Sequence, residues 1–173
     1  KPDAAEEVTG SAEPGSGADE ITVGSVAGKF VGHFDPTNGF STDLSAAAQY
    51  LVYDQTFYVD PRTGEWTSDI FESWDFTDDN ALVMKLKDSV TFTSGDKMLA
   101  SDVLWSITRM STVPRNKSNF DVVDLESSSA DDDNGVVTLQ YTTPYGPFQA
   151  GIQCGVLNQS WINEHGGPDS FDW

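Results

Sequence analysis

The sequence predicts a mixed α/β (α+β) fold, and three observations support this prediction. Short segments rich in β-branched and aromatic residues alternate with segments whose apolar residues have helical spacing. Turn-forming residues separate them, most clearly at 60–64 and 131–135. With 38% hydrophobic and 12% aromatic residues, the 173-residue chain can bury one sizeable core.

The first predicted elements are one strand and one helix. Residues 21–24 form a short β-rich run, which we expect to be the first strand. Ser41 or Thr42 is placed to cap a helix over residues 44–57, where the apolar members fall on one face.

The next segments are shorter. We expect residues 70–74 to form a short amphipathic turn. Residues 81–87 alternate apolar and polar side chains, which predicts a half-buried strand, and residues 90–92 are expected to continue as its neighbour.

The best-defined helix is predicted over residues 100–110, where apolar side chains line one stripe. Asp102 lies in its first turn and Arg109 in its last, where the helix dipole favours these charges. Two β-rich runs, 121–128 and 136–141, follow, and the Asp- and Gly-containing turn between them is typical of a hairpin.

The two ends of the chain differ in composition. Residues 148–152 are expected to form a short helix within a stretch rich in Gly, Pro and aromatic residues. Residues 1–20 are small, polar and acidic, and such a segment cannot offset the entropy cost of ordering. We therefore expect a flexible acidic leader over 1–20 and a folded part over 21–173.

The charge balance excludes several kinds of partner. Nine Lys and Arg oppose 28 Asp and Glu, which gives a formal net charge of -19. Nucleic acid and anionic membrane faces are therefore poor partners, since both require clustered basic residues. The single Cys154 excludes an intrachain disulfide and a multi-cysteine metal cage, and we expect it to be a buried, inert thiol.

The sequence offers no convincing metal or cofactor site. His33 and His165 are far apart, and neither lies in an H-x-x-x-H arrangement. A calcium loop aligned on Gly135 would place Ala130 at the first ligand position and Tyr141 at the last, so the match fails. We expect neither a metal nor a cofactor.

Carboxylates and aromatic residues supply the remaining candidates. Glu65, Glu72 and Asp75 could host a carboxylate pair for glycoside hydrolysis, and no G-x-S-x-G elbow is present. Trp74 and Trp105 lie on periodic elements and are expected in the core. Aromatic residues in irregular segments are the candidates to face a ligand, namely Phe34, Phe40, Phe120, Tyr145, Phe148 and Trp161.

Six segments carry a family resemblance when they are taken in order. They are FDP at 34–36, YLVYD at 50–54, DPRTGE at 60–65, ESW at 72–74, the run from Thr77 to Phe92, and the run from Gly95 to Ser106. With matching gaps, this set resembles the family 5 extracellular solute-binding proteins, the dipeptide-, oligopeptide- and nickel-binding receptors of ABC importers. The resemblance covers about residues 21–165.

Two positions depart from the family pattern. Thr93 stands where a His is usual, and Leu99 stands where a Thr is usual before Ala100. Because that Thr would cap the helix, Ser101 or water is expected to serve instead.

The resemblance implies a partial type II periplasmic-binding-protein-like fold. The chain would hold the first strand of the large lobe and the small subdomain inserted into it, and residues 21–173 would be the N-terminal part of the solute-binding lobe. Because the second lobe would be absent, we expect weak or no solute binding by this piece alone.

The function implied is that of a non-enzymatic substrate-binding component of an ABC importer. It would capture oligopeptides or other small solutes and deliver them to a membrane permease. Carried over from the family, the expected ligand-binding residues are Gly32, His33, Phe34, Asn119 and Phe120.

The resemblance also implies an extracytoplasmic location, either as a cell-surface lipoprotein or in the periplasm. A removed Cys before Lys1 would carry the lipid, and the acidic leader would act as the tether. Two alternatives remain open from the residues themselves: a secreted acidic hydrolase, and a cell-surface interaction domain without a small ligand.

Overall fold

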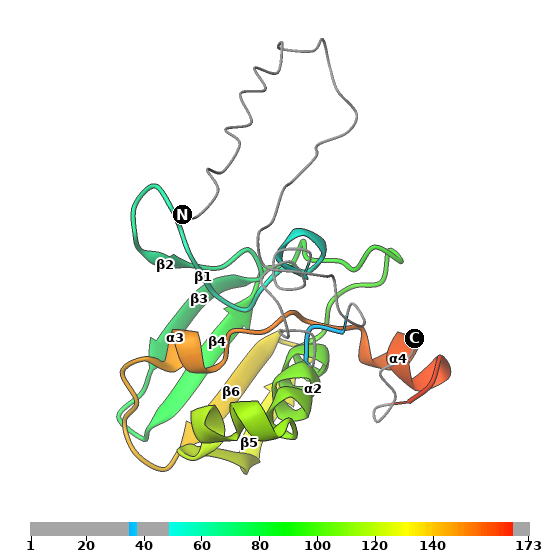
Figure 1. Ribbon diagram of the computed structural model, residues 1–173. Coiled ribbons are helices and arrows are strands. Elements are labelled where there is room, and N and C mark those ends of the chain that lie inside the picture. The colour runs from blue at the N-terminus through cyan, green and yellow to red at the C-terminus, as the bar shows by residue number, and fades with distance from the viewer. Residues whose placement is uncertain (1–34, 38–48, 168–173) are drawn as a thin grey trace, which may run out of the picture.

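The computed structural model describes residues 35–37 and 49–167 (Figure 1). Within them, a four-stranded antiparallel sheet has the order β3-β4-β6-β5. A small ribbon of two strands stands beside it. The strands are β1 (Tyr58–Val59), β2 (Trp66–Thr67), β3 (Phe71–Phe76), β4 (Ala81–Leu86), β5 (Val123–Asp131) and β6 (Val136–Tyr141).

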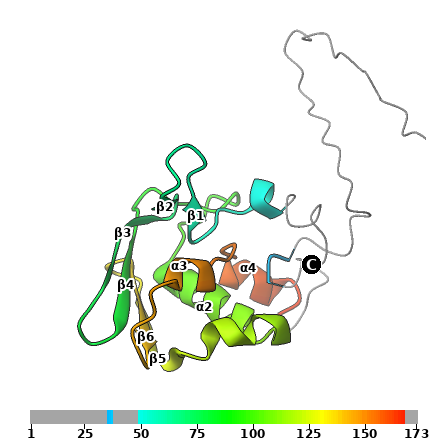
Figure 2. The ribbon, with the colours of Figure 1, turned by 60° about the vertical axis from the view of Figure 1, so that its left-hand side comes forward.

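The helices lie on one side of the sheet, which Figure 2 shows nearly edge-on. They are α2 (Ala100–Ser111), the 3-10 helix η1 (Pro114–Phe120), α3 (Phe148–Gly151) and α4 (Gln159–Glu164). Helix α2 contacts β5 and β6. The predicted mixed α/β class is therefore confirmed. No helix among the described residues combines the length and the apolar character needed to cross a membrane.

The two central strands form the middle of the core. Leu82 of β4 lies opposite Leu139 of β6, and Met84 lies opposite Val137. All four side chains are fully buried, and burying each contributes roughly 1.5–3 kcal/mol. The alternation in residues 81–87 thus predicts β4 correctly.

Helix α2 also follows its predicted apolar stripe. Val103 and Ile107 are fully buried and Met110 is nearly so, and all three belong to the same core as the strands. Trp74 and Trp105, both of which we expect in the core, are half-buried, and Trp74 packs against the core. Trp74 packs edge-on against the buried ring of Phe57, with 5.0 Å between ring centroids.

The N-terminus of α2 is capped by two carboxylates. The Leu99 N–H donates to Asp102 Oδ2 at 2.9 Å. The Ser101 N–H donates to Asp132 Oδ1 at 2.8 Å, and the Ser101 hydroxyl donates to Asp132 Oδ2 at 2.9 Å. Asp132 lies in the β5–β6 turn, so the hairpin replaces the missing Thr cap. The expectation that Ser101 or water would be the cap is wrong in this respect.

The helix expected over 44–57 ends early. Of its described part, residues 49–52 are helical and residues 53–57 are not. The Thr56 N–H donates to the Cys154 carbonyl at 2.9 Å, and Gln55 forms an isolated antiparallel β-bridge with Gly155. Pairing with this distant segment therefore overrides the local helical preference. Leu51 and Val52, which the prediction placed on the apolar face, are exposed.

The predictions for two short segments are also wrong. Residues 70–74 do not form a turn, because Phe71 opens β3 and pairs with Leu86. A register shift between Phe71 and Ser73 interrupts the alternation that would have revealed this strand. Residues 90–92 do not form a strand beside β4, because β3 and β6 occupy its two sides.

The C-terminal elements agree with the prediction in part, since helix α4 was not predicted and the strand expected at 121–128 is β5 at 123–131. Strands β5 and β6 form the expected hairpin, with Asp131 opposite Val136. Gly135 closes the turn at φ 61°, a conformation that favours glycine. Helix α3 matches the short helix expected at 148–152. The leader and the first strand at 21–24 lie outside the described residues.

Candidate functional site

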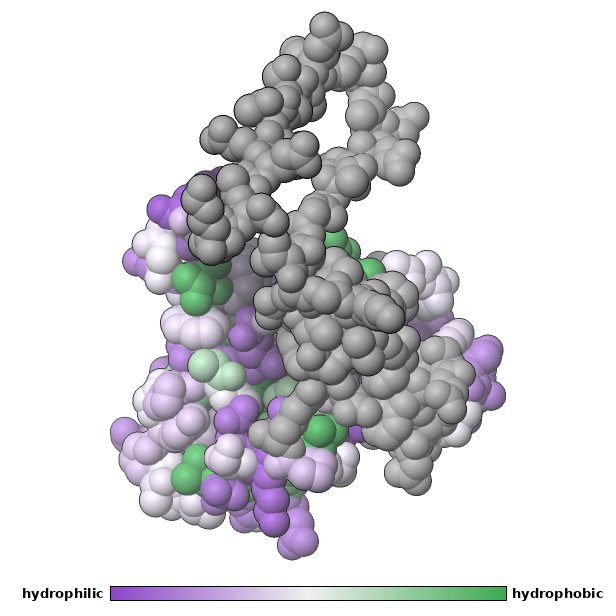
Figure 3. Space-filling view, in the orientation of Figure 1, coloured by the Kyte–Doolittle hydropathy of each residue, from purple (hydrophilic) through white to green (hydrophobic). Residues whose placement is uncertain are grey.

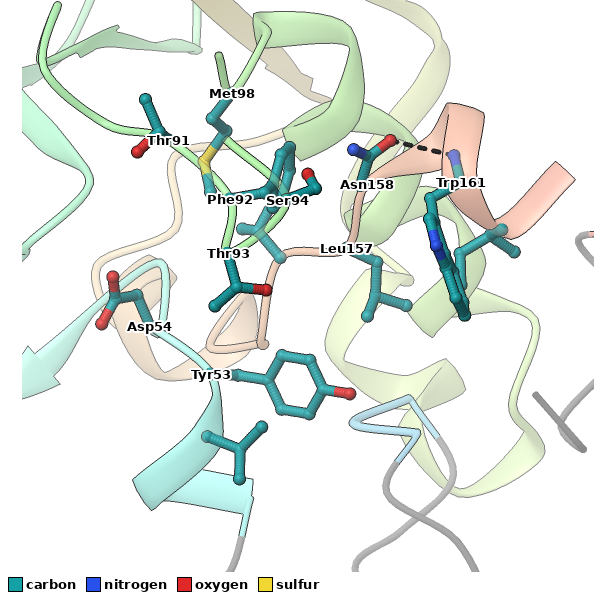
Figure 4. A pocket seen from close by; sticks show the side chains of 13 residues that line it. Tyr53, Asp54, Thr91, Phe92, Thr93, Ser94, Met98, Leu157, Asn158 and Trp161 are labelled. Atoms are coloured by element: carbon teal, nitrogen blue, oxygen red, sulfur yellow. Dashed lines mark hydrogen bonds between the residues drawn. The ribbon is translucent and has the colours of Figure 1, made fainter. Parts of the chain in front are cut away.

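A pocket of about 350 Å³ lies where three distant segments meet (Figure 4). The segments are residues 52–54, the loop 91–98, and residues 156–162, which run into α4. The described residues that line the pocket are Val52, Tyr53, Asp54, Thr91, Phe92, Thr93, Ser94, Met98, Val156, Leu157, Asn158, Trp161 and Ile162.

The loop 91–98 is held as a tight turn. The Phe92 N–H donates to the Asp96 carbonyl at 2.8 Å, and the Gly95 N–H donates to the Phe92 carbonyl at 2.9 Å. The Ser94 hydroxyl donates to Asp96 Oδ2 at 2.8 Å. These bonds fix the loop that presents Thr93 and Ser94 to the pocket.

Asn158 joins that loop to α4. Its Oδ1 accepts from the Trp161 N–H at 3.0 Å, as an N-cap does (Figure 4). Its amide nitrogen donates to Asp96 Oδ2 at 3.1 Å. Trp161 in turn stacks on His165, with 4.1 Å between ring centroids. The wall formed by Trp161 is thus tied to the loop opposite.

The floor of the pocket is anchored to α2. The Gln159 N–H donates to Asp102 Oδ1 at 2.9 Å, and the Leu157 N–H donates to Ser106 Oγ at 3.0 Å. Burial raises the pKa of Asp102, against the opposing effect of its two backbone hydrogen bonds. Leu157 and Ile162 are buried, so the floor is apolar and fixed.

Tyr53 forms the third wall, and its ring reaches across the pocket beneath Thr93 (Figure 4). Gly155 lies directly behind it, since a Cβ there would stand 2.8 Å from Tyr53 Cβ and 3.0 Å from Pro36 Cβ. Burial, and then the charge of Asp35, raise the pKa of the Tyr53 hydroxyl. The ring therefore stays a neutral phenol across the physiological range.

The pocket has the chemistry of a binding site. An apolar floor, two aromatic walls and a few hydroxyl, amide and carboxylate groups are typical of sites that hold small organic ligands. Among the described residues, no group of three or more His, Cys, Asp and Glu is arranged to hold a metal ion.

The expected ligand-binding residues stay a prediction. Gly32, His33 and Phe34 lie outside the described residues. Asn119 and Phe120 end η1 and do not line this pocket, and the Phe120 side chain is 8% exposed within the core.

Of the aromatic residues proposed to face a ligand, Trp161 does line the pocket. Tyr145 and Phe148 pack against the core instead, and Phe34 and Phe40 lie outside the described residues. The sequence reasoning missed Tyr53 and Leu157, because long-range pairing of residues 53–57 with 152–156 brings them together.

The other candidates lie away from the pocket. Glu65, Glu72 and Asp75 are exposed carboxylates that do not line it, so nothing in their placement favours the hydrolase alternative. Cys154 is 2% exposed, and burial raises the pKa of its thiol to about 12. The expected buried position of the thiol is confirmed.

Solved structures show what class of protein has this fold. NikZ from Campylobacter jejuni, in complex with Ni(L-His), aligns with a TM-score of 0.56 at 23% identity over 68% of this chain and 23% of its own. OppA from Burkholderia pseudomallei aligns with a TM-score of 0.64 at 13% identity, over 77% of this chain and 29% of its own. The oligopeptide-binding protein AppA from Bacillus subtilis, in complex with a nonapeptide, aligns with a TM-score of 0.62 at 16% identity, over 75% of this chain and 26% of its own. The chain therefore has part of the fold of type II solute-binding proteins.

The family follows from the sequence match. Residues 65–159, more than half of the chain, match the bacterial extracellular solute-binding proteins, family 5 Middle. The chain belongs to this family, which confirms the resemblance carried by the six ordered segments. It spans between a fifth and a third of the length of the solved structures named above. No curated protein sequence matches it.

Proposed function

We propose that the chain is part of the substrate-binding component of an ABC importer, which captures peptides or related small solutes outside the cytoplasm. The observation that carries this proposal is the family match over residues 65–159 on a fold of the same class. The role includes no catalytic step, so the protein acts by binding and release.

Two further observations support the assignment. The solved proteins of similar fold include one in complex with a nonapeptide and one in complex with Ni(L-His), so this fold accommodates small solutes of both kinds. The described surface in Figure 3 is mostly hydrophilic, with hydrophobic residues scattered over it, which suits a protein exposed to water. A membrane permease is the partner that the role requires.

Solute uptake by the source organism tests the proposal. We expect deletion of the gene to reduce uptake of labelled oligopeptides, or of nickel, and a plasmid copy to restore it. Fractionation with an antibody should recover the protein outside the cytoplasm. Unchanged uptake of every peptide and nickel complex tested, together with a cytoplasmic location, would overturn the assignment.

A further inference from the structure

The pocket carries one charged side chain among its described lining residues. Asp54 is an exposed carboxylate, and it forms no ion pair or side-chain hydrogen bond with the rest of the described chain. No Lys, Arg or His lines the pocket within the same residues. A ligand with an anionic group would therefore meet no opposite charge among these side chains, and the net charge of -19 disfavours it further.

The wall next to Asp54 favours a cation for a second reason. The ring of Tyr53, the residue that precedes Asp54, lines the same cavity (Figure 4). Aromatic faces attract a nearby ammonium group through the negative potential above the ring.

The floor requires an apolar body on the same ligand. Leu157 and Ile162 are buried at 4% and 1% exposure, and Met98 at 6%. A strongly hydrated metal ion would gain nothing from such a surface, whereas an aliphatic or aromatic group displaces water from it. The volume of about 350 Å³ falls in the range of small-molecule sites.

We propose that this pocket binds an organic amine that carries an apolar aliphatic or aromatic body. The ammonium group lies at Asp54, and the apolar body lies against Tyr53 and Leu157. Asp54 and Trp161 stand at opposite ends of the cavity in Figure 4, so the two parts of the ligand have separate places. The proposal goes beyond the import role and does not depend on it.

A series of probes that differ only in charge tests the ligand class. Phenethylamine, 2-phenylethanol and phenylacetate share one ring and a two-carbon frame, and can be titrated into the 173-residue protein by NMR. We expect the amine to bind about fivefold more tightly than the alcohol and phenylacetate to bind most weakly. The advantage of the amine should shrink as salt is raised, because Asp54 is exposed.

A substitution locates the site. Asp54→Asn should lower the affinity for phenethylamine to that for the alcohol, and it affects an exposed side chain that the core does not need. Asp78→Asn is the matched control, since Asp78 is an exposed carboxylate that does not line the pocket. It should leave the amine affinity unchanged.

Three results would overturn the proposal. They are equal affinity for all three probes, an Asp54→Asn variant that binds the amine like the wild type, and no binding of the amine at about 10 mM, far above the range of specific sites. Peptide uptake is measured in a separate experiment. A failure of the pocket proposal would therefore leave the import role intact, and a failure of the import role would leave the pocket proposal intact.

Discussion

Arg109 of α2 forms a buried, two-pronged ion pair with Asp35. Its Nη1 donates to Asp35 Oδ1 at 2.8 Å and its Nη2 donates to Asp35 Oδ2 at 2.6 Å. The two side chains are 5% and 1% exposed. Because the residues are 74 positions apart, the pair fastens residues 35–37 to the C-terminal end of α2.

The neighbours of this pair complete its hydrogen bonding. Arg109 Nη1 also donates to the Thr37 hydroxyl at 2.8 Å, and the Thr37 N–H donates to Asp35 Oδ1 at 2.8 Å. The guanidinium lies 5.7 Å from the ring centroid of Trp105. Neither charge is left unpaired, so removing one side would strand the other in the interior.

We therefore expect Arg109→Met to be strongly destabilising. The substitution leaves the Asp35 carboxylate buried without its cation, and the free energy of unfolding should fall by about 3–5 kcal/mol. Arg109→Lys should fall between the wild type and Arg109→Met, because one ammonium group cannot donate in the same two-pronged geometry. Urea denaturation followed by Trp fluorescence measures both changes.

The matched control is Arg62→Met. Arg62 pairs with Asp60 at 3.4 Å, but its side chain is 88% exposed. An exposed pair contributes about 1 kcal/mol or less, so this variant should unfold close to the wild type. Equal stability of Arg109→Met and Arg62→Met would contradict a structural role for the buried pair.

Gly155 is the second position where a small change should have a large effect. A Cβ would stand 2.8 Å from Tyr53 Cβ, a distance that real Cβ contacts essentially never show, and 3.0 Å from Pro36 Cβ, which is tighter than most real contacts. Since both neighbours are close to the backbone, Gly155→Ala should displace the segment that carries Tyr53. We expect a loss of about 1–3 kcal/mol in urea denaturation.

Gly146→Ala controls for the loss of a glycine as such. No atom lies within 4 Å of a Cβ added at Gly146, and its φ is outside the left-handed region. This variant should be neutral or slightly more stable, since alanine restricts the unfolded chain. If the two alanine variants had the same stability, crowding at Gly155 would be refuted.

Local patterns predict three of the regular elements of this fold correctly. Period-two alternation predicts β4, the apolar stripe predicts α2, and the Asp- and Gly-rich turn predicts the β5–β6 hairpin, because each signal lies within one short segment. The ordered motifs also indicate the family, which the match over residues 65–159 confirms.

Contacts between distant segments escape such reasoning. Arg109 fits the last turn of a helix by its charge, but nothing in the sequence pairs it with Asp35. The end of the helix near residue 52 depends on two hydrogen bonds between Thr56 and Cys154, one donated by each backbone N–H. The pocket is missed for the same reason, since its three segments meet only in the folded chain.

Asp132 of the β5–β6 turn caps helix α2, and the strength of this cap can be tested. Its two carboxylate oxygens accept from the Ser101 N–H and hydroxyl at the start of α2. Asp132→Ala should therefore lower the free energy of unfolding by about 1 kcal/mol, as the loss of a helix cap does.

Asp133→Ala, in the same exposed turn, removes the same charge without removing the cap. It should change stability by less than about 0.5 kcal/mol. Thermal unfolding followed by circular dichroism compares the two. An equal loss of stability in the two variants would show that the charge of the turn, and not the cap, is what matters.

Cys154 makes stability depend on pH in the alkaline range. Burial raises the pKa of its thiol from 9.0 to about 12. Above pH 9 the unfolded chain releases the thiol proton while the folded chain keeps it, so the unfolded state is favoured progressively. The free energy of unfolding should fall as pH rises from 9 towards 12, by at most about 1.4 kcal/mol per pH unit for this one proton.

Cys154→Ala isolates this contribution. The variant lacks the thiol, so its stability should fall less steeply between about pH 8 and about pH 10.5 than that of the wild type. Burial also raises the pKa of Tyr141, and this effect is common to both proteins and cancels in the comparison. Urea denaturation at several pH values gives the two slopes. Parallel slopes would mean that the Cys154 thiol ionises in the folded protein as readily as in the unfolded chain.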